Sequence, residues 1–187
     1  ALDHARLGMG RQDIPLWIAG RGPMVLGLAG RQADGVIFTV KPDLGAAIDV
    51  VNNAAAQVGR PQPIRSYLGR ICFTKEMLEG QRRTLSFVLM DSPPRVLRSL
   101  GLDEDELATI AKAARDNDPG MVDPLVSDDL LERYQVAGTP AECTVKLAKM
   151  VSDYGLHAVF IDALASEIEE NLEVLATSLS IIKGRTL

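Results

Sequence analysis

The sequence has few of the residues that form cross-links or bind metals. Cys72 and Cys143 are its only cysteines, and His4 and His157 are its only histidines. Two thiols so far apart exclude a disulfide framework and lack the close ligand spacing of a zinc site. We expect both cysteines to be buried packing residues, and we expect no metal. An isolated histidine more often packs than catalyses, so neither histidine receives a catalytic role.

The sequence also lacks a run of basic residues and a long apolar segment. Its 20 lysines and arginines are scattered among 25 acidic residues, which gives a net charge of −5. This balance argues against a protein that binds nucleic acid through the phosphate backbone. No segment reaches the roughly 20 apolar residues that cross a bilayer, and the N-terminus has no signal-peptide pattern. We expect a cytoplasmic protein with neither a nucleic-acid nor a membrane partner.

The sequence does contain enough apolar residues for one substantial core. Of its 187 residues, 47% are hydrophobic and 24% are charged, which is typical of a globular chain. We therefore predict a single domain over residues 1–187. The chain begins with Ala1 rather than Met, so we expect it to be processed or cut from something longer.

Residues 14–42 predict a strand, a glycine turn, a helix and a second strand. Leu16–Ala19 and Val36–Val40 are short apolar runs of the buried parallel type. Between them, the sequence Gly20-Arg21-Gly22-Pro23 has two glycines that let backbone amides approach an anion and a proline suited to the first helical turn. The N–H groups at such a helix end can bind phosphate. The alternative is that the glycines only permit a tight turn, and the motif alone leaves both interpretations open.

The rest of the chain continues the alternation of apolar strands and amphipathic helices. Four strands, each followed by helical structure, predict a parallel α/β protein with right-handed crossovers. A closed (β/α)8 barrel needs about 250 residues, so four units indicate half of one. The remaining predicted segments are helix 44–58, strand 64–73, a helical insertion over about 75–133, helix 140–154, strand 158–161 and helix 168–182.

Two polar clusters in this part of the chain have structural explanations. Residues 103–106 are all acidic, but acidic residues crowded at a helix start interact with the helix dipole and stay solvated, so we expect no metal there. Thr139, Pro140 and Glu142 predict a helix N-terminus in which Thr139 is the N-cap and Glu142 completes a capping box.

Three blocks, in order along the chain, carry a resemblance to a known family. They are Gly22–Val36, Ser92–Leu97 and Val136–Glu142. The chain resembles the luciferase-like family of flavin- and deazaflavin-dependent oxidoreductases, and within it the branch that contains methylenetetrahydromethanopterin reductase. The resemblance extends from about residue 14 to about residue 162. It implies a TIM-barrel (β/α)8 luciferase-like fold, of which this chain contains only the last four βα units, the C-terminal half.

The resemblance also implies a cofactor and a place for its phosphate. The cofactor is coenzyme F420 or, as the alternative, FMN, and its phosphate would lie over the glycine turn at the C-terminal rim of the barrel. Thr39 would donate to a phosphate or ribityl oxygen, the Val40 backbone would flank the chain, and Lys41 would add charge. For Arg21 and Lys41 a solvated surface role is equally compatible. The expected cofactor-binding residues are Ala19, Gly20, Arg21, Gly22, Thr39, Val40 and Lys41.

The implied reaction is hydride transfer by an F420-dependent enzyme to a small-molecule substrate, with this chain on the cofactor-phosphate side. No residue here is a convincing general acid or base, so the catalytic residues stay unassigned. Residues 162–167 replace the Gly- and Pro-containing loop of the reductase branch, a departure that leaves the substrate open. The alternatives are an FMN-dependent luciferase-like monooxygenase and a non-catalytic flavin-binding or association remnant. As its partner we expect a second copy in a homo-oligomer or a missing N-terminal half.

Overall fold

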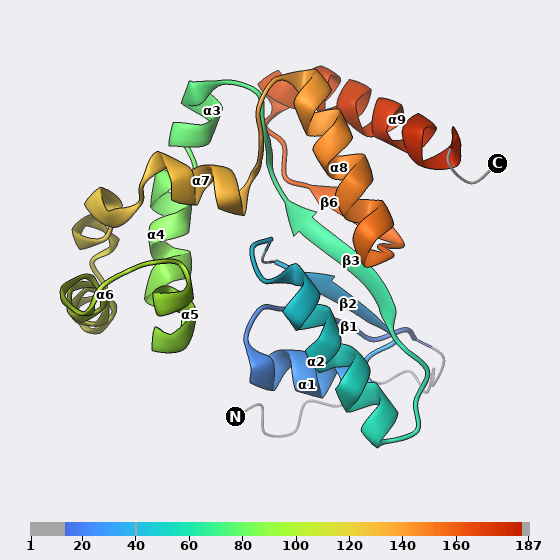
Figure 1. The fold of residues 1–187 in the computed structure, drawn as a ribbon, viewed down its shortest axis with the longest axis horizontal. Coiled ribbons are helices and arrows are strands. Elements are labelled where there is room, and N and C mark those ends of the chain that lie inside the picture. Colours follow the sequence, from blue (N-terminus) through green and yellow to red (C-terminus); the bar gives the residue numbers. More distant parts are fainter. Residues whose placement is uncertain (1–13, 40, 185–187) are drawn as a thin grey trace.

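The computed structural model describes residues 14–39 and 41–184, and its centre is a four-stranded parallel sheet (Figure 1). The strands are β1 Trp17–Gly20, β2 Gly35–Phe38, β3 Ile64–Gly69, β4 Ile71–Cys72, β5 Val136–Ala137 and β6 Ala158–Ile161. The central sheet has the order β1-β2-β3-β6, and every neighbouring pair is parallel. The short strands β4 and β5 form a separate parallel pair. The predicted α/β fold with parallel strands is therefore confirmed.

Helices connect these strands. The α-helices are α1 Pro23–Gln32, α2 Leu44–Gln57, α3 Lys75–Glu79, α4 Arg82–Met90, α5 Pro94–Ser99, α6 Glu104–Asp116, α7 Asp128–Tyr134, α8 Pro140–Tyr154 and α9 Ile168–Gly184. The short 3-10 helices are η1 Pro119–Met121, η2 Asp123–Leu125 and η3 Ala165–Glu167. Residues 75–134, from α3 to α7, are called the helical segment below. Figure 1 shows this segment gathered at the left, beside the sheet, with α8 and α9 at the upper right.

The predicted strand over residues 64–73 is wrong in its length. The chain leaves the central sheet after β3, and β4 pairs with β5 instead of continuing beside β6. The break occurs at Arg70, whose guanidinium donates two hydrogen bonds, of 2.9 and 2.7 Å, to the Glu167 carboxylate. Both side chains of this ion pair are nearly buried. A long-range partner of this kind cannot be read from the local apolar pattern.

The two faces of the central sheet are covered to different extents. Side chains alternate between the faces along each strand. On one face, Val36, Phe38 and Tyr67 belong to the buried core, together with residues of α1, α2 and α8 such as Leu26, Ile48, Val51, Cys143 and Leu147. We call this the covered face. The opposite face carries Trp17, Ile64, Leu68 and Phe160, which are 38–45% exposed, and is called the bare face.

Local sequence signals explain how several helices begin. Thr139 accepts a hydrogen bond from the Glu142 backbone N–H at 3.3 Å and Glu142 accepts one from the Thr139 backbone at 2.8 Å, so the predicted capping box is confirmed. Asp103 and Glu106 form a second capping box at the start of α6. The acidic cluster at residues 103–106 thus lies at a helix start, as expected, and three of its four residues are exposed.

The cysteines and His157 lie in packed or strand-end positions, as expected. Cys72 and Cys143 are both buried free thiols, which confirms their packing role. His157 precedes β6, where its Nδ1 accepts a hydrogen bond from the Arg65 backbone N–H at 3.1 Å. His4 lies outside the described residues. Within residues 14–39 and 41–184, no three His, Cys, Asp or Glu side chains are placed to hold a metal ion, and no helix has the length and apolar character needed to cross a membrane.

Candidate functional site

The turn between β1 and α1 has an opening that none of the residues 14–39 and 41–184 fills. Gly22 is the N-cap of α1, with φ −81° and ψ 148°, a conformation open to any residue. A Cβ at Gly22 would meet no atom within 4 Å. The backbone therefore does not require glycine here, and its main effect is to leave free space. Gly20 differs, because a Cβ there would lie 2.6 Å from a methyl carbon of Val25.

This free space is part of a cavity of about 630 Å³ between the sheet and the helical segment. The volume lies within the range of small-molecule sites. Its walls combine the strand ends with helices from a distant part of the chain. From the sheet side and α1 come Ala19, Gly20, Arg21, Gly22, Pro23, Val25, Leu26 and Thr39; from α2 and the loop before it, Asp43, Ala46, Ala47 and Val50; from the helical segment, Val88, Asp91, Ser92, Pro93, Arg95, Val96, Ser99 and Tyr134.

The cavity brings together five of the seven residues expected to bind a cofactor. Ala19, Gly20, Arg21, Gly22 and Thr39 all line it. Thr39 reaches the site because β2 is paired with β1, and its backbone N–H donates to the Gly20 carbonyl at 3.4 Å. Parallel pairing therefore places the Thr39 backbone beside the glycine turn. Val40, the sixth expected residue, lies outside the described residues.

Lys41, the seventh expected residue, is not brought to this cavity. Its ammonium donates to the main-chain carbonyls of Glu132, at 3.0 Å, and of Gln135. These carbonyls lie at the C-terminal end of α7, the negative end of the helix dipole, which attracts a cation. Burial, followed by the nearby Lys146 charge, lowers the pKa of Lys41 from 10.5 to about 8. Lys41 instead lines a second cavity, of about 560 Å³, between α7 and α8.

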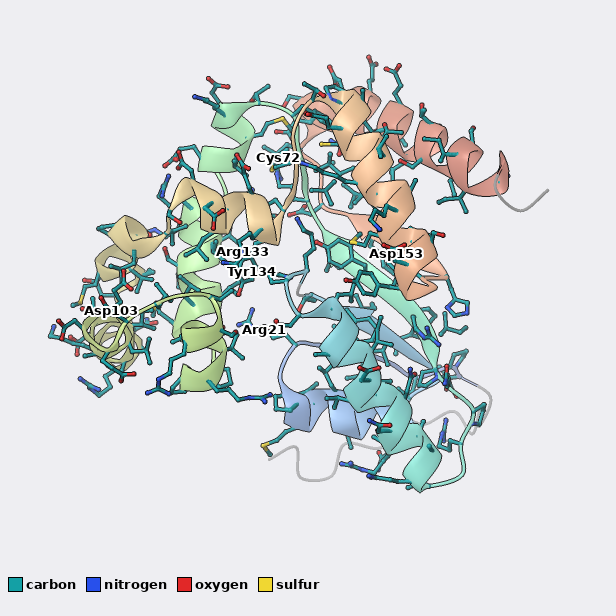
Figure 2. The ribbon with its side chains drawn as sticks, viewed as in Figure 1. Arg21, Cys72, Asp103, Arg133, Tyr134 and Asp153 are labelled. Atoms are coloured by element: carbon teal, nitrogen blue, oxygen red, sulfur yellow. The ribbon has the colours of Figure 1, made fainter. Side chains whose placement is uncertain are left out.

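An ion pair links the glycine turn to the helical segment across the cavity. The Arg21 guanidinium donates to the Asp91 carboxylate at 2.7 Å. Asp91 is the C-cap of α4, and its side chain is 72% exposed, against 29% for Arg21. Figure 2 shows Arg21 in the region between α1 and the helical segment, with Tyr134 close by. Arg21, for which phosphate contact and a surface role were both left open, is therefore half-buried and already paired with a carboxylate.

Two further groups complete the polar lining near Arg21. Asp43 is the N-cap of α2, but its side chain makes no capping hydrogen bond, so its carboxylate is not used to hold the helix. Burial raises the pKa of Tyr134 to about 12, and the Asp43 carboxylate adds to this rise, while the Arg21 charge opposes it. Asp43, Tyr134 and Arg21 are thus close enough to interact electrostatically.

The helical-segment wall of the cavity was not predicted as part of the site. Asp91, Ser92 and Arg95 lie about seventy residues along the chain from the glycine turn. One signal could have found two of them, because Ser92 and Arg95 belong to the second block that carries the family resemblance. Asp43 and Tyr134 had no such signal, since only the packing of distant helices brings them to the cavity.

The lining can hold an anionic group against an apolar body, but it contains no evident acid–base catalyst. Val25, Leu26, Val50, Val88 and Val96 supply apolar surface, and no histidine or cysteine of the described residues lines the cavity. Burial raises the pKa of the Cys72 thiol, which lies outside this cavity, to about 11. This thiol therefore stays protonated and unreactive near neutral pH. The arrangement is suited to positioning a ligand.

Comparison with known proteins gives the same family as the sequence blocks. The sequence model of the family described as luciferase-like monooxygenase matches residues 4–157. A 5,10-methylenetetrahydromethanopterin reductase of Methanopyrus kandleri is 26% identical over 170 residues, which cover 87% of this chain and 49% of that protein. The protein of the same name from Methanolobus tindarius is 24% identical over 155 residues, which cover 79% of this chain and 48% of that protein.

A solved structure extends the likeness to the fold. The coenzyme F420-dependent tetrahydromethanopterin reductase of Methanopyrus kandleri superimposes with a TM-score of 0.62 at 26% identity, covering 79% of this chain and 44% of that structure. This confirms the expected luciferase-like α/β fold. The chain spans about half the length of the curated relatives it matches, which agrees with a partial barrel.

Proposed function

The chain belongs to the luciferase-like monooxygenase family, and from this membership we propose that it forms the cofactor-phosphate side of an F420-dependent oxidoreductase. The observation that carries the proposal is the free space at Gly22, because it lies at the N-terminus of α1 and opens into the 630 Å³ cavity. A glycine that the backbone does not require, at a positive helix end, is suited to a ligand that approaches the main chain closely.

In this proposal, the residues that line the cavity bind and orient the cofactor. Backbone N–H groups of the Gly20–Gly22 turn hold the phosphate, and the Thr39 hydroxyl donates to a phosphate or ribityl oxygen. Arg21 offsets the negative charge. The valines of α1, α2 and α4 exclude water from the apolar part of the ligand. The bound cofactor would supply the hydride chemistry itself, which belongs to its ring rather than to these side chains.

F420 is the first choice of cofactor because two lines of likeness agree. The Methanopyrus kandleri relative by sequence is named a methylenetetrahydromethanopterin reductase, and the structure from the same organism is described as F420-dependent. FMN remains the alternative, since the family description is that of a monooxygenase. A reduced one-carbon carrier of the pterin type is the substrate class that these names favour, and residues 162–167 leave its identity open.

We further propose that the bare face of the sheet is covered by additional βα units. These would belong to an N-terminal half of the barrel, or to a second copy of the chain. The support comes from the partial coverage of the relatives and from four apolar side chains that are exposed on the same face of a parallel sheet. Parallel sheets are normally covered on both faces.

Substitution of Gly22 tests the cofactor-phosphate assignment. A valine fits the local backbone, so we expect Gly22→Val to lower the free energy of unfolding by about 1 kcal/mol or less. Its side chain would occupy the space needed by the phosphate. We expect F420 binding, measured by fluorescence titration of the purified protein, to weaken at least tenfold, about 1.4 kcal/mol.

Gly184→Val is the matched control, because a Cβ there also meets no atom within 4 Å but lies at the end of α9. It should leave the affinity unchanged. If the wild type binds the cofactor and Gly22→Val binds it equally well, the phosphate does not bind at this turn. If the wild type binds neither F420 nor FMN, the proposed function is wrong.

A further inference from the structure

The charges that line the 630 Å³ cavity cancel, although the proposed ligand is an anion. Among the described residues, its lining contains two cations, Arg21 and Arg95, and two carboxylates, Asp43 and Asp91. A site that only needed to attract phosphate would carry an excess of positive charge. The carboxylates therefore require an explanation, and the more informative of them is Asp91, because it makes direct contact with Arg21 at 2.7 Å.

The exposure of Asp91 argues against a structural role for this pair. With 72% of its side chain exposed, the ion pair is largely screened by water and contributes little to folding. Asp43, the other carboxylate, is not used as a helix cap either. Both carboxylates are thus held at the cavity without an evident structural benefit, and both repel a negative ligand placed near Arg21.

The consequence depends on how much charge the ligand's phosphate carries. A phosphodiester, such as the one in F420, has one negative charge. A phosphomonoester, such as the one in FMN, has a second ionisation near pH 6 and therefore carries between one and two charges at neutral pH. Because Arg21 is already paired with Asp91, it can neutralise one negative charge of a bound phosphate better than two. The carboxylates of Asp43 and Asp91 repel the second charge.

We propose that Asp91 makes this site selective for a monoanionic phosphodiester over a dianionic phosphomonoester. The inference rests on the proposed function, because it assumes that the phosphate binds at the glycine turn. It assigns to the Arg21–Asp91 pair a role in distinguishing ligand classes. The ring of the cofactor plays no part in this distinction.

The test compares ligands that differ only at the phosphate. Binding constants of the purified protein are measured for FMN, for the monomethyl phosphodiester of FMN and for riboflavin, which has no phosphate. Asp91→Asn keeps the shape and removes the charge. Because the carboxylate is exposed, we expect this variant to bind FMN about threefold more tightly, to bind the methyl ester less than twofold more tightly, and to leave riboflavin unchanged.

Glu104→Gln is the matched control. Glu104 forms an exposed ion pair of 2.7 Å with Arg98 and does not line the cavity, so the variant removes one negative charge at a distance. It should leave all three constants unchanged. Thermal unfolding of Asp91→Asn should match that of the wild type within the error of the measurement, since a lower melting temperature would indicate a structural clamp.

The possible failures are distinguishable. If Asp91→Asn increases the affinity for FMN and for its methyl ester equally, the proposed selectivity is wrong, but the phosphate site is not. An unchanged FMN constant, with wild-type binding intact, would also overturn the selectivity. If the wild type binds neither F420 nor any of the phosphorylated ligands, the proposed function fails together with this inference.

Discussion

The two faces of the central sheet carry similar apolar side chains but bury them very differently. On the covered face, Phe38 is 0% and Tyr67 is 1% exposed; on the bare face, Trp17 is 38% and Phe160 is 43% exposed. Strands that are apolar on both sides are typical of parallel sheets enclosed by other elements. The apolar side chains of these strands are therefore suited to a sheet covered on both faces, whereas the described residues cover only one face.

The largest difference between the faces should appear in a matched pair of phenylalanine truncations. Phe38→Ala should lower the free energy of unfolding by about 3–5 kcal/mol, because it leaves a cavity in the packed core. Phe160→Ala should lower it by less than about 1.5 kcal/mol, because water already reaches that ring. Urea denaturation of both variants measures the difference. Equal losses would show that the faces are equally buried in solution.

The helices over the covered face offer a second test, since α1 and α2 approach closely at Gly30. A Cβ at Gly30 would lie 2.3 Å from the Val51 carbonyl oxygen. We expect Gly30→Ala to destabilise the protein by about 1–3 kcal/mol as the helices separate. Gly27→Ala in the same helix meets only the flexible Arg31 side chain, at 3.3 Å, and should be neutral or stabilise by up to about 1 kcal/mol. Calorimetry of the two variants checks the contrast.

A smaller effect is expected at the start of α8, another helix over the covered face. Thr139→Ala removes the capping hydrogen bond to the Glu142 N–H and should cost about 1 kcal/mol of unfolding free energy. Thr139→Ser keeps the hydroxyl and should restore most of it. The measurement is again urea denaturation, and a serine variant as unstable as the alanine variant would assign the loss to packing of the methyl group.

The smallest stability effect, but a distinct change in association, is expected on the bare face. Phe160→Lys should alter the unfolding free energy by less than about 1 kcal/mol, while weakening any self-association through exposed apolar side chains. Phe87→Lys is the control, because Phe87 is similarly exposed, at 47%, but lies in α4. Sedimentation equilibrium of the chain compares the two. If Phe160→Lys and Phe87→Lys weaken self-association equally, the bare face is not the contact surface.

Local signals account for most of what the sequence predicted correctly. The capping box at Thr139 involves residues three apart, and the strand at 158–161 is marked by its own apolar run, so neither depends on distant contacts. The glycine turn and Thr39 were placed together correctly because parallel pairing aligns successive strand ends. These features need only local preferences and the general topology of parallel units.

Long-range packing explains what the sequence did not predict. Nothing near Arg21 indicates that Asp91 reaches it, and nothing near Lys41 indicates that its ammonium binds the end of α7. The break of the predicted strand at Arg70 has the same origin, since its partner is Glu167. In each case, a cationic side chain contacts a partner that only the packing of distant elements brings near it.

The pairing of Arg70 with Glu167 also has a consequence for engineering and for evolutionary divergence. Glu167 lies in η3, at the end of the loop that follows β6, whereas Arg70 directly follows β3. A loop transplant that removed Glu167 would leave a buried guanidinium without its counter-ion, a change that is usually strongly destabilising. The loop and Arg70 therefore form one exchangeable unit, and successful chimeras should require both to be replaced together.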